Sequence, residues 1–129
     1  MFTIDKLSRT PIYEQLIAQF EYWILSGEIA PDGKLPSVRE LSQQLCINPN
    51  TLQRAYAEIE RRGLCYSVPG SGRYLTKDAI LHLQSEAELK INEFAELAEK
   101  LRDCGVPKTA LLNVVASVYA STERKETEP

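Results

Sequence analysis

The sequence predicts a mainly α-helical fold with one small β-hairpin, and three observations support this fold class. Apolar residues recur at steps of three and four along most of the chain, which is the period of amphipathic helices. Two strand-like runs, at 64–68 and 73–76, flank the sequence Pro-Gly-Ser-Gly, as expected of strand, turn and strand. Two short helical patterns directly precede this hairpin. This order predicts a winged helix-turn-helix in residues 1–77, followed by a C-terminal helical hairpin in residues 78–129.

The first predicted helix opens at Thr10-Pro11 and ends at Gly27. Its apolar side chains have helical spacing, and they are Ile12, Leu16, Phe20, Trp23 and Ile24. Aromatic residues at this spacing usually pack in a core, so we expect core packing here rather than a ligand site. The link that follows is rich in turn residues, and Lys34-Leu35 within it is expected to add a short strand to the hairpin.

The second and third predicted helices carry clear start signals. Ser37 and Glu40 have the S-x-x-E spacing of a capping box, which places the start of the second helix at Ser37. Asn48 is a suitable N-cap and Pro49 fits the first helical position, so the third helix begins about three residues after the second ends. A step of about 100° per residue gives this third helix a buried stripe, which consists of Leu52, Ala55, Tyr56 and Ile59.

The opposite face of the third helix is polar. It presents Asn50, Arg54, Ala57 and Arg61, with Gln53 beside them and Asn48 and Thr51 in the first turn. Amide and guanidinium groups can pair with base edges and phosphates in a major groove. Solvation alone would also explain a polar face. The hairpin that follows favours DNA binding, because its glycine-rich tip lets the backbone approach a phosphate closely and Arg73 stands where this wing would touch DNA.

Five blocks follow one another along the chain, and they are PIYEQL (11–16), GEIAPDG (27–33), LPSVREL (35–41), NPNTLQRAY (48–56) and GSG (70–72). In this order they resemble the GntR family of bacterial transcription regulators, and the short tail resembles its YtrA subfamily. The resemblance implies that Arg39, the start of the third helix and Gly70 contact operator DNA. It also implies a small helical dimerisation region in place of a large effector domain.

The chain departs from the common family pattern at two places. Many members carry arginine where Pro49 and Gln53 stand, and threonine and phenylalanine where Arg73 and Tyr74 stand. The operator of a relative therefore cannot be transferred to this chain.

We expect three kinds of DNA contact. Phosphates are held by Lys34 and Arg39. Bases or the adjacent backbone are read by Asn48, Asn50, Thr51, Gln53 and Arg54, and the wing is docked by Gly70 and Arg73.

The charge is unevenly distributed along the chain. The net charge is −3, but residues 1–77 carry nine basic against eight acidic side chains, whereas residues 78–129 carry six against ten. The sequence therefore predicts a basic patch on an otherwise acidic protein, with DNA binding that is sensitive to salt.

Several functions are disfavoured by length and motif content. The 129 residues leave no room for a catalytic domain beside the winged helix, and no paired carboxylates or Ser/His arrangement occurs at usable spacing, so we expect no enzyme and no cofactor. Cys46, Cys65 and Cys104 form no C-x-x-C pair, and His82 is alone, so neither a metal site nor a disulfide is predicted. We expect the cysteines to be small buried hydrophobes rather than redox sensors. No apolar run approaches 18 residues and no signal peptide is recognisable, so we expect a cytoplasmic protein without a membrane partner.

The C-terminal region reads as two helices. The first ends at Gly105, Pro107 opens the second through about Ala120, and residues 121–129 are expected to be a frayed charged tail. Such a hairpin is too small to bury its own apolar stripe. Packing on the first domain is one solution, and an interface between two copies fits better. The residues expected in this homodimer interface are Ile80, Leu83, Ala87, Ile91, Phe94, Ala98, Leu101, Leu111, Leu112, Val115, Val118 and Tyr119.

These observations predict a sequence-specific DNA-binding transcriptional regulator, a repressor, that binds a roughly palindromic operator as a homodimer. The alternative is a winged-helix protein-interaction module that docks a partner through its long C-terminal helix. Salt dependence separates the two, because binding to phosphates weakens steeply with ionic strength and an apolar interface does not. A helical hairpin offers little concave volume for a small molecule, so the existence of an effector stays open.

Overall fold

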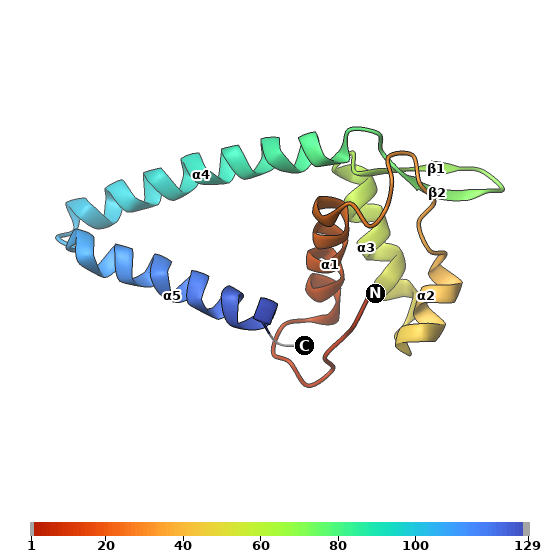
Figure 1. Cartoon of the computed structure of the whole chain (residues 1–129), viewed down its shortest axis with the longest axis horizontal. Coiled ribbons are helices and arrows are strands. Elements are labelled where there is room, and N and C mark those ends of the chain that lie inside the picture. The colour runs from red at the N-terminus through yellow and green to blue at the C-terminus, as the bar shows by residue number, and fades with distance from the viewer. Residues whose placement is uncertain (1, 128–129) are drawn as a thin grey trace. The chain divides into compact units, whose positions relative to one another are not determined.

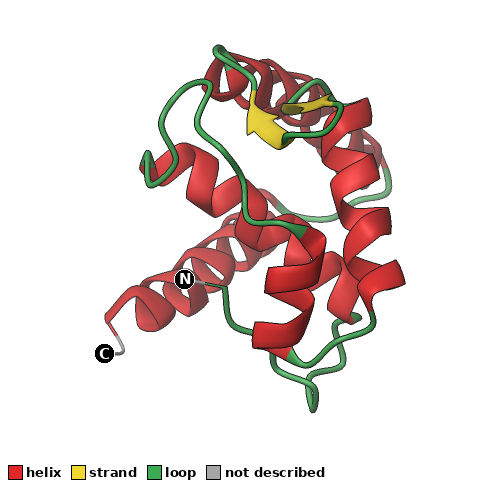
Figure 2. Cartoon of the chain, turned by 90° about the vertical axis from the view of Figure 1, so that its right-hand side faces the viewer, coloured by secondary structure: helices red, strands yellow, loops and turns green. Residues whose placement is uncertain are grey.

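The computed structural model describes the backbone of residues 2–127, and within them it contains five helices and one antiparallel β-hairpin (Figures 1 and 2). The elements are α1 (Ile12–Ser26), α2 (Val38–Leu45), α3 (Pro49–Arg61), β1 (Cys65–Val68), β2 (Gly72–Leu75), α4 (Ala79–Asp103) and α5 (Lys108–Thr127). The chain divides after Glu86 into two compact units, which are described separately. The predicted mainly α-helical fold with one hairpin is confirmed.

The starts of α2 and α3 follow from local capping chemistry. The Ser37 hydroxyl accepts a hydrogen bond from the Glu40 N–H at 3.0 Å, so Ser37 is the N-cap of α2. The Asn48 side-chain oxygen accepts from the Asn50 N–H at 2.9 Å, and Pro49 occupies the first position of α3. Residues 46–48 are the whole connection between the two helices, as predicted from the sequence.

The core of the first unit lies between α1, α2, α3 and the hairpin. The predicted stripe of α3 is fully buried, and the Phe20 ring of α1 lies 4.9 Å from the Tyr56 ring of α3. Trp23 is half-buried and packs against Phe2 with 4.0 Å between ring centroids. The expectation that the α1 aromatics are packing residues is therefore confirmed.

The hairpin pairs β1 with β2 in register from Cys65–Leu75 to Val68–Gly72. Its turn has Pro69 at the second position and Gly70 at the third, where a φ of +77° suits glycine, and the Ser71 N–H donates to the Val68 carbonyl at 3.0 Å. The predicted third strand is present as a single bridge between Lys34 and Tyr74.

The first unit extends past the boundary predicted at residue 77. The first two turns of α4 belong to it, because Ala79 and Leu83 are buried in its core. Leu83 was expected in the dimer interface, and the structure corrects this: one helical turn after Ala79, it faces the core of its own unit. Ile80, on another side of α4, is exposed.

The second unit contains the rest of α4 and α5. The C-terminus of α4 is closed by a Schellman motif, in which the Val106 N–H donates to the Leu101 carbonyl at 3.0 Å and Gly105 adopts a φ of +90°. Helix α5 continues through Thr127, beyond the predicted end at Ala120. Of the tail that was expected to be frayed, residues 128 and 129 lie outside the described residues.

Candidate nucleic-acid interface

The N-terminal half of α3 presents its polar side chains to solvent. Asn50, Gln53 and Arg54 are exposed, and Thr51 is half-buried. They lie opposite the buried stripe because that stripe packs against α1, which leaves the other side of the helix open. Asn48 is exposed too, but its side-chain oxygen is already used to cap the helix. Its amide N–H groups are what it can offer to a ligand.

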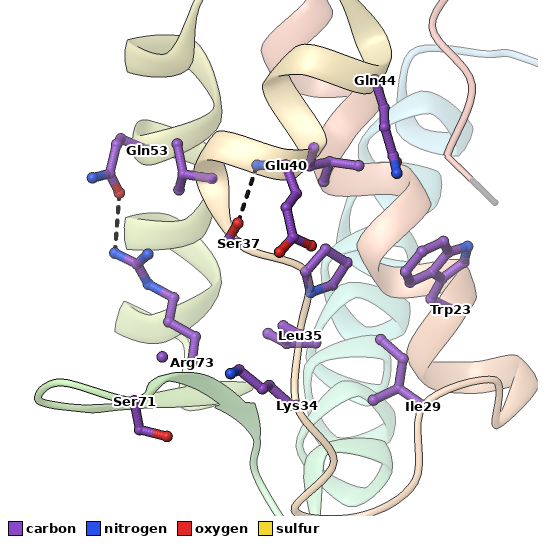
Figure 3. Close-up of a pocket in the computed structure, with 14 residues that line it drawn as sticks. Trp23, Ile29, Lys34, Leu35, Ser37, Glu40, Gln44, Gln53, Ser71 and Arg73 are labelled. Carbon is purple, nitrogen blue, oxygen red and sulfur yellow. Dashed lines mark hydrogen bonds between the residues drawn. The ribbon is translucent and has the colours of Figure 1, made fainter.

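The wing reaches this face of α3 through Arg73 of β2 (Figure 3). Its guanidinium carbon lies 4.9 Å from the centroid of the Tyr56 ring, and its Nη2 donates to Gln53 Oε1 at 3.1 Å. Its Nε lies 4.0 Å from Glu60 Oε1, and it is buried without a hydrogen-bond partner among the described residues. The sequence placed Arg73 where the wing touches DNA, whereas the structure turns it inward between the wing and α3.

A hollow of about 680 Å³ lies beside this contact, lined by residues of the wing, the link before α2, α2 itself, α1 and α3 (Figure 3). Lys34, Gln53 and Arg73 all line it, together with backbone at Gly72. Lys34 passes close to Gly72: a side chain built there would put its Cβ 3.1 Å from Lys34 Cε. The hollow therefore brings polar donors from the link, α3 and the wing to one place.

Basic side chains are divided between exposed and structural positions. Lys34 and Arg39 are exposed, and the exposed Arg54 stacks over Tyr13 with 4.8 Å from its guanidinium carbon to the ring centroid. Arg61 is exposed but hydrogen-bonded to Glu58, one turn before it. Lys34, Arg39 and Arg54 are therefore exposed cations of the helix-turn-helix and of the link before it.

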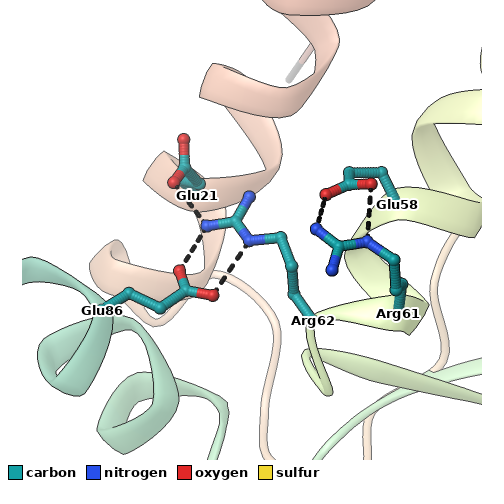
Figure 4. Close-up of polar contacts among 5 residues, drawn as sticks. All are labelled: Glu21, Glu58, Arg61, Arg62 and Glu86. Carbon is teal, nitrogen blue, oxygen red and sulfur yellow. Dashed lines mark hydrogen bonds and ion pairs between the residues drawn. The ribbon is translucent and has the colours of Figure 1, made fainter. Parts of the chain in front are cut away.

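Arg62 forms ion pairs that join α3, α1 and α4 and does not face solvent (Figure 4). It is largely buried, and it donates to Glu21 of α1 at 2.9 Å and to Glu86 of α4 at 3.0 Å. The hydrogen bond that Arg62 donates to the Glu86 carboxylate is the largest cause of the raised pKa of Arg62, so the guanidinium stays charged. Arg62 is one of the nine basic side chains of residues 1–77, and the sequence did not predict these contacts, since nothing in the local pattern identifies partners 41 and 24 residues away.

Tyr56 fastens α3 to the link that precedes α2. It is fully buried, and its hydroxyl donates to the carbonyl oxygen of Pro36. Burial also raises the pKa of the Tyr56 hydroxyl, which keeps it protonated as a donor. The sequence predicted the burial of Tyr56 but not this hydrogen bond, which ties α3 to the residue before the N-cap of α2.

The cysteines differ from expectation at two of three positions. Cys65 is buried, and burial raises the pKa of its thiol to about 11. Cys46 and Cys104 lie at helix ends and are exposed, so the prediction that they are buried is wrong.

Within the described residues, no group of three His, Cys, Asp or Glu side chains is placed to hold a metal ion. No described helix is both long enough and apolar enough to span a bilayer.

Comparison with known proteins identifies the family. Residues 12–75 match the family described as "Bacterial regulatory proteins, gntR family". A solved structure described as a GntR family transcriptional regulator from Listeria monocytogenes is 33% identical, covers 88% of this chain and 98% of its own, and superposes with a TM-score of 0.63. The chain belongs to the GntR family of bacterial regulatory proteins. These are regulators and not enzymes, in agreement with the prediction.

Two further GntR-family relatives are informative. The transcriptional repressor YtrA of Bacillus subtilis is 47% identical over 79 residues, a match that spans 61% of this chain and 61% of the YtrA chain. A structure described as the DNA-binding domain of AraR in complex with operator ORX1 is 32% identical, with a TM-score of 0.53, and covers 59% of this chain and 96% of its own. The winged helix-turn-helix expected from the sequence is the fold of this family.

Proposed function

We propose that this GntR-family chain is a sequence-specific DNA-binding transcriptional repressor. The observation that carries the proposal is the exposed polar start of α3 beside a wing that reaches it through Arg73. The relative YtrA is named a repressor, and the AraR domain is described in complex with an operator. Binding to a bacterial chromosome would place the protein in the cytoplasm, as the sequence predicted.

The proposed DNA contacts are of two kinds: some position the protein on the DNA backbone and others read the bases. Lys34, in the link before α2, and Arg39, in the first turn of α2, are exposed cations and are assigned to phosphates. Asn50, Thr51, Gln53 and Arg54, with Asn48 in the first turn, are assigned to bases or the adjacent backbone in the major groove. Gly70 is exposed at the tip of the wing and is assigned to close backbone approach.

We assign the second unit to homodimerisation. Within this unit, α4 and α5 enclose a hollow of about 350 Å³ whose lining is apolar except at Lys108. Phe94 is 58% exposed and Leu112 is 54% exposed, and both belong to this one apolar lining; large contiguous apolar patches on a surface mark interaction sites. A second copy of this hairpin provides a matching apolar surface, and two-fold symmetry then presents two α3 helices to an operator that is roughly palindromic.

Selection from a randomised duplex DNA pool at about 150 mM salt tests the DNA proposal. Recovery of an inverted repeat by the purified protein is the expected result. Failure to enrich any sequence, at this or lower salt, contradicts the proposal and favours the protein-interaction alternative, in which α4 docks a different protein.

Sedimentation tests the dimer. The Phe94→Glu variant places a charge on the apolar lining of the second unit, and it should sediment as a monomer and lose affinity for the selected operator. The Glu96→Gln variant is the matched control, because Glu96 is exposed on the same helix outside that lining. Equal sedimentation of both variants and the wild type would contradict the assigned interface.

A further inference from the structure

We propose that Arg73 determines which base Gln53 reads, by occupying the side-chain oxygen of Gln53. This inference rests on the proposed DNA binding and adds a specificity rule to it. Arg73 acts through Gln53, so its role is that of a positioning residue.

The chemistry of the two side chains determines which atom of Gln53 faces Arg73. Arg73 Nη2 donates to Gln53 Oε1 at 3.1 Å (Figure 3). A guanidinium has only donors, so it is the oxygen of the Gln53 carboxamide, and not the nitrogen, that faces Arg73. The two N–H donors of Gln53 then remain for a ligand.

Arg73 is held in this position before any DNA is present. Its guanidinium stacks on the ring of Tyr56 and lies 4.0 Å from Glu60, and its side chain is only 27% exposed. Its backbone is held as well, because its carbonyl accepts from the Leu35 N–H at 2.9 Å and the residue pairs with Ser67 across the hairpin. The contact with Gln53 is therefore a preorganised part of the surface.

This contact changes the hydrogen bonds that Gln53 can make in a major groove. A free glutamine pairs with adenine through both ends of its amide, since its oxygen accepts from N6 and its nitrogen donates to N7. Arg73 occupies one of the two lone pairs of Gln53 Oε1, and its positive charge beside the other repels the amino group of adenine, so the N–H groups are what Gln53 offers to a base. Guanine presents two acceptors, N7 and O6, at the same place. The pair of Gln53 and Arg73 therefore favours guanine over adenine.

The experiment compares the sequence preferences that the wild type and four variants select from a randomised duplex pool. The base read by Gln53 is the position at which the Gln53→Ala variant loses the preference of the wild type. At that position the wild type should prefer guanine over adenine by about ten-fold, within the range of a good base contact. The Arg73→Met variant keeps an apolar stem on Tyr56 but donates nothing, and its preference should shift to adenine.

Two controls separate base choice from charge and from folding. Lys34→Met removes another cation of the same hollow that makes no contact with Gln53, so it should weaken binding without changing the preferred base. Arg73→Lys retains a donor for Gln53 Oε1 and should keep guanine. Thermal unfolding of each variant shows whether the fold is intact, and if Arg73→Met does not fold it is replaced in the comparison by Arg73→Leu, which also lacks both the cation and a donor.

Each outcome decides between the inference and the function it rests on. Adenine at the mapped position in the wild type, an unchanged guanine preference in Arg73→Met, or no position that depends on Gln53 would overturn the inference while leaving DNA binding intact. Failure of the wild type to select any sequence would instead refute the proposed function, and the inference with it.

Discussion

The two faces of α3 can be separated by a pair of substitutions, Tyr56→Ala on the buried side and Arg54→Ala on the exposed side. Tyr56 has no exposed surface, and truncating a buried aromatic side chain to alanine costs about 3–5 kcal/mol. That is a large share of the roughly 5–15 kcal/mol by which domains are stable. Arg54 is exposed and contacts the Tyr13 ring, a cation–π contact worth about 0.5–1 kcal/mol at such a site.

Urea unfolding followed by tryptophan fluorescence measures both effects, because Trp23 is the one tryptophan of the chain and packs in the first unit. Tyr56→Phe divides the larger effect further. It removes only the hydroxyl that donates to Pro36, and leaving that carbonyl unpaired costs about 1–3 kcal/mol. Arg54→Ala should keep nearly all the stability and lose at least about ten-fold in DNA affinity. Equal loss of stability in Arg54→Ala and Tyr56→Ala would refute the assignment of the two faces.

Three further predictions follow from contacts of the first unit. Arg62→Met should lower the free energy of unfolding by about 2 kcal/mol, because Glu21 and Glu86 lose their shared cation, and adding Glu21→Gln should restore part of it in urea titrations. Gly70→Ala should cost about 1 kcal/mol in the same assay, since alanine is strained at a φ of +77° although a Cβ there meets no described atom within 4 Å. The pKa of the Cys65 thiol is about 11 in the folded chain against 9.0 ordinarily, so the protonated thiol stabilises the fold below pH 9 and this contribution is lost as the pH rises towards 11. The melting temperature of the wild type should therefore fall more over this range than that of Cys65→Ala, and equal slopes would contradict it.

Local chemistry made most of the fold predictable. Ser37, Asn48 and Pro49 act within their own helix turns, and Gly70 acts within its own hairpin turn, so the residues that decide these features are neighbours in the sequence. The buried stripe of α3 was predictable for a related reason, because helical period alone defines an apolar face. These local signals fixed the elements and their order.

The parts that the sequence did not predict depend on which partner lies across a tertiary contact. Arg73 turns inward because Tyr56, Gln53 and Glu60 meet it there, and α3 is separated from it by the whole of β1 and the turn. Leu83 belongs to the core of the first unit because α4 begins against that core, which periodicity along α4 cannot indicate.

The salt dependence of operator binding tests the central claim most directly. If Lys34 and Arg39 of each copy in a dimer neutralise phosphates, at least about four counterions are released and affinity falls by about 100-fold between 50 and 200 mM salt. Fluorescence anisotropy of a labelled duplex that carries the selected sequence measures this slope. A steep loss is the predicted result. Binding that does not change with salt, or no binding at the lowest salt, would contradict the account of this surface as one that reads DNA.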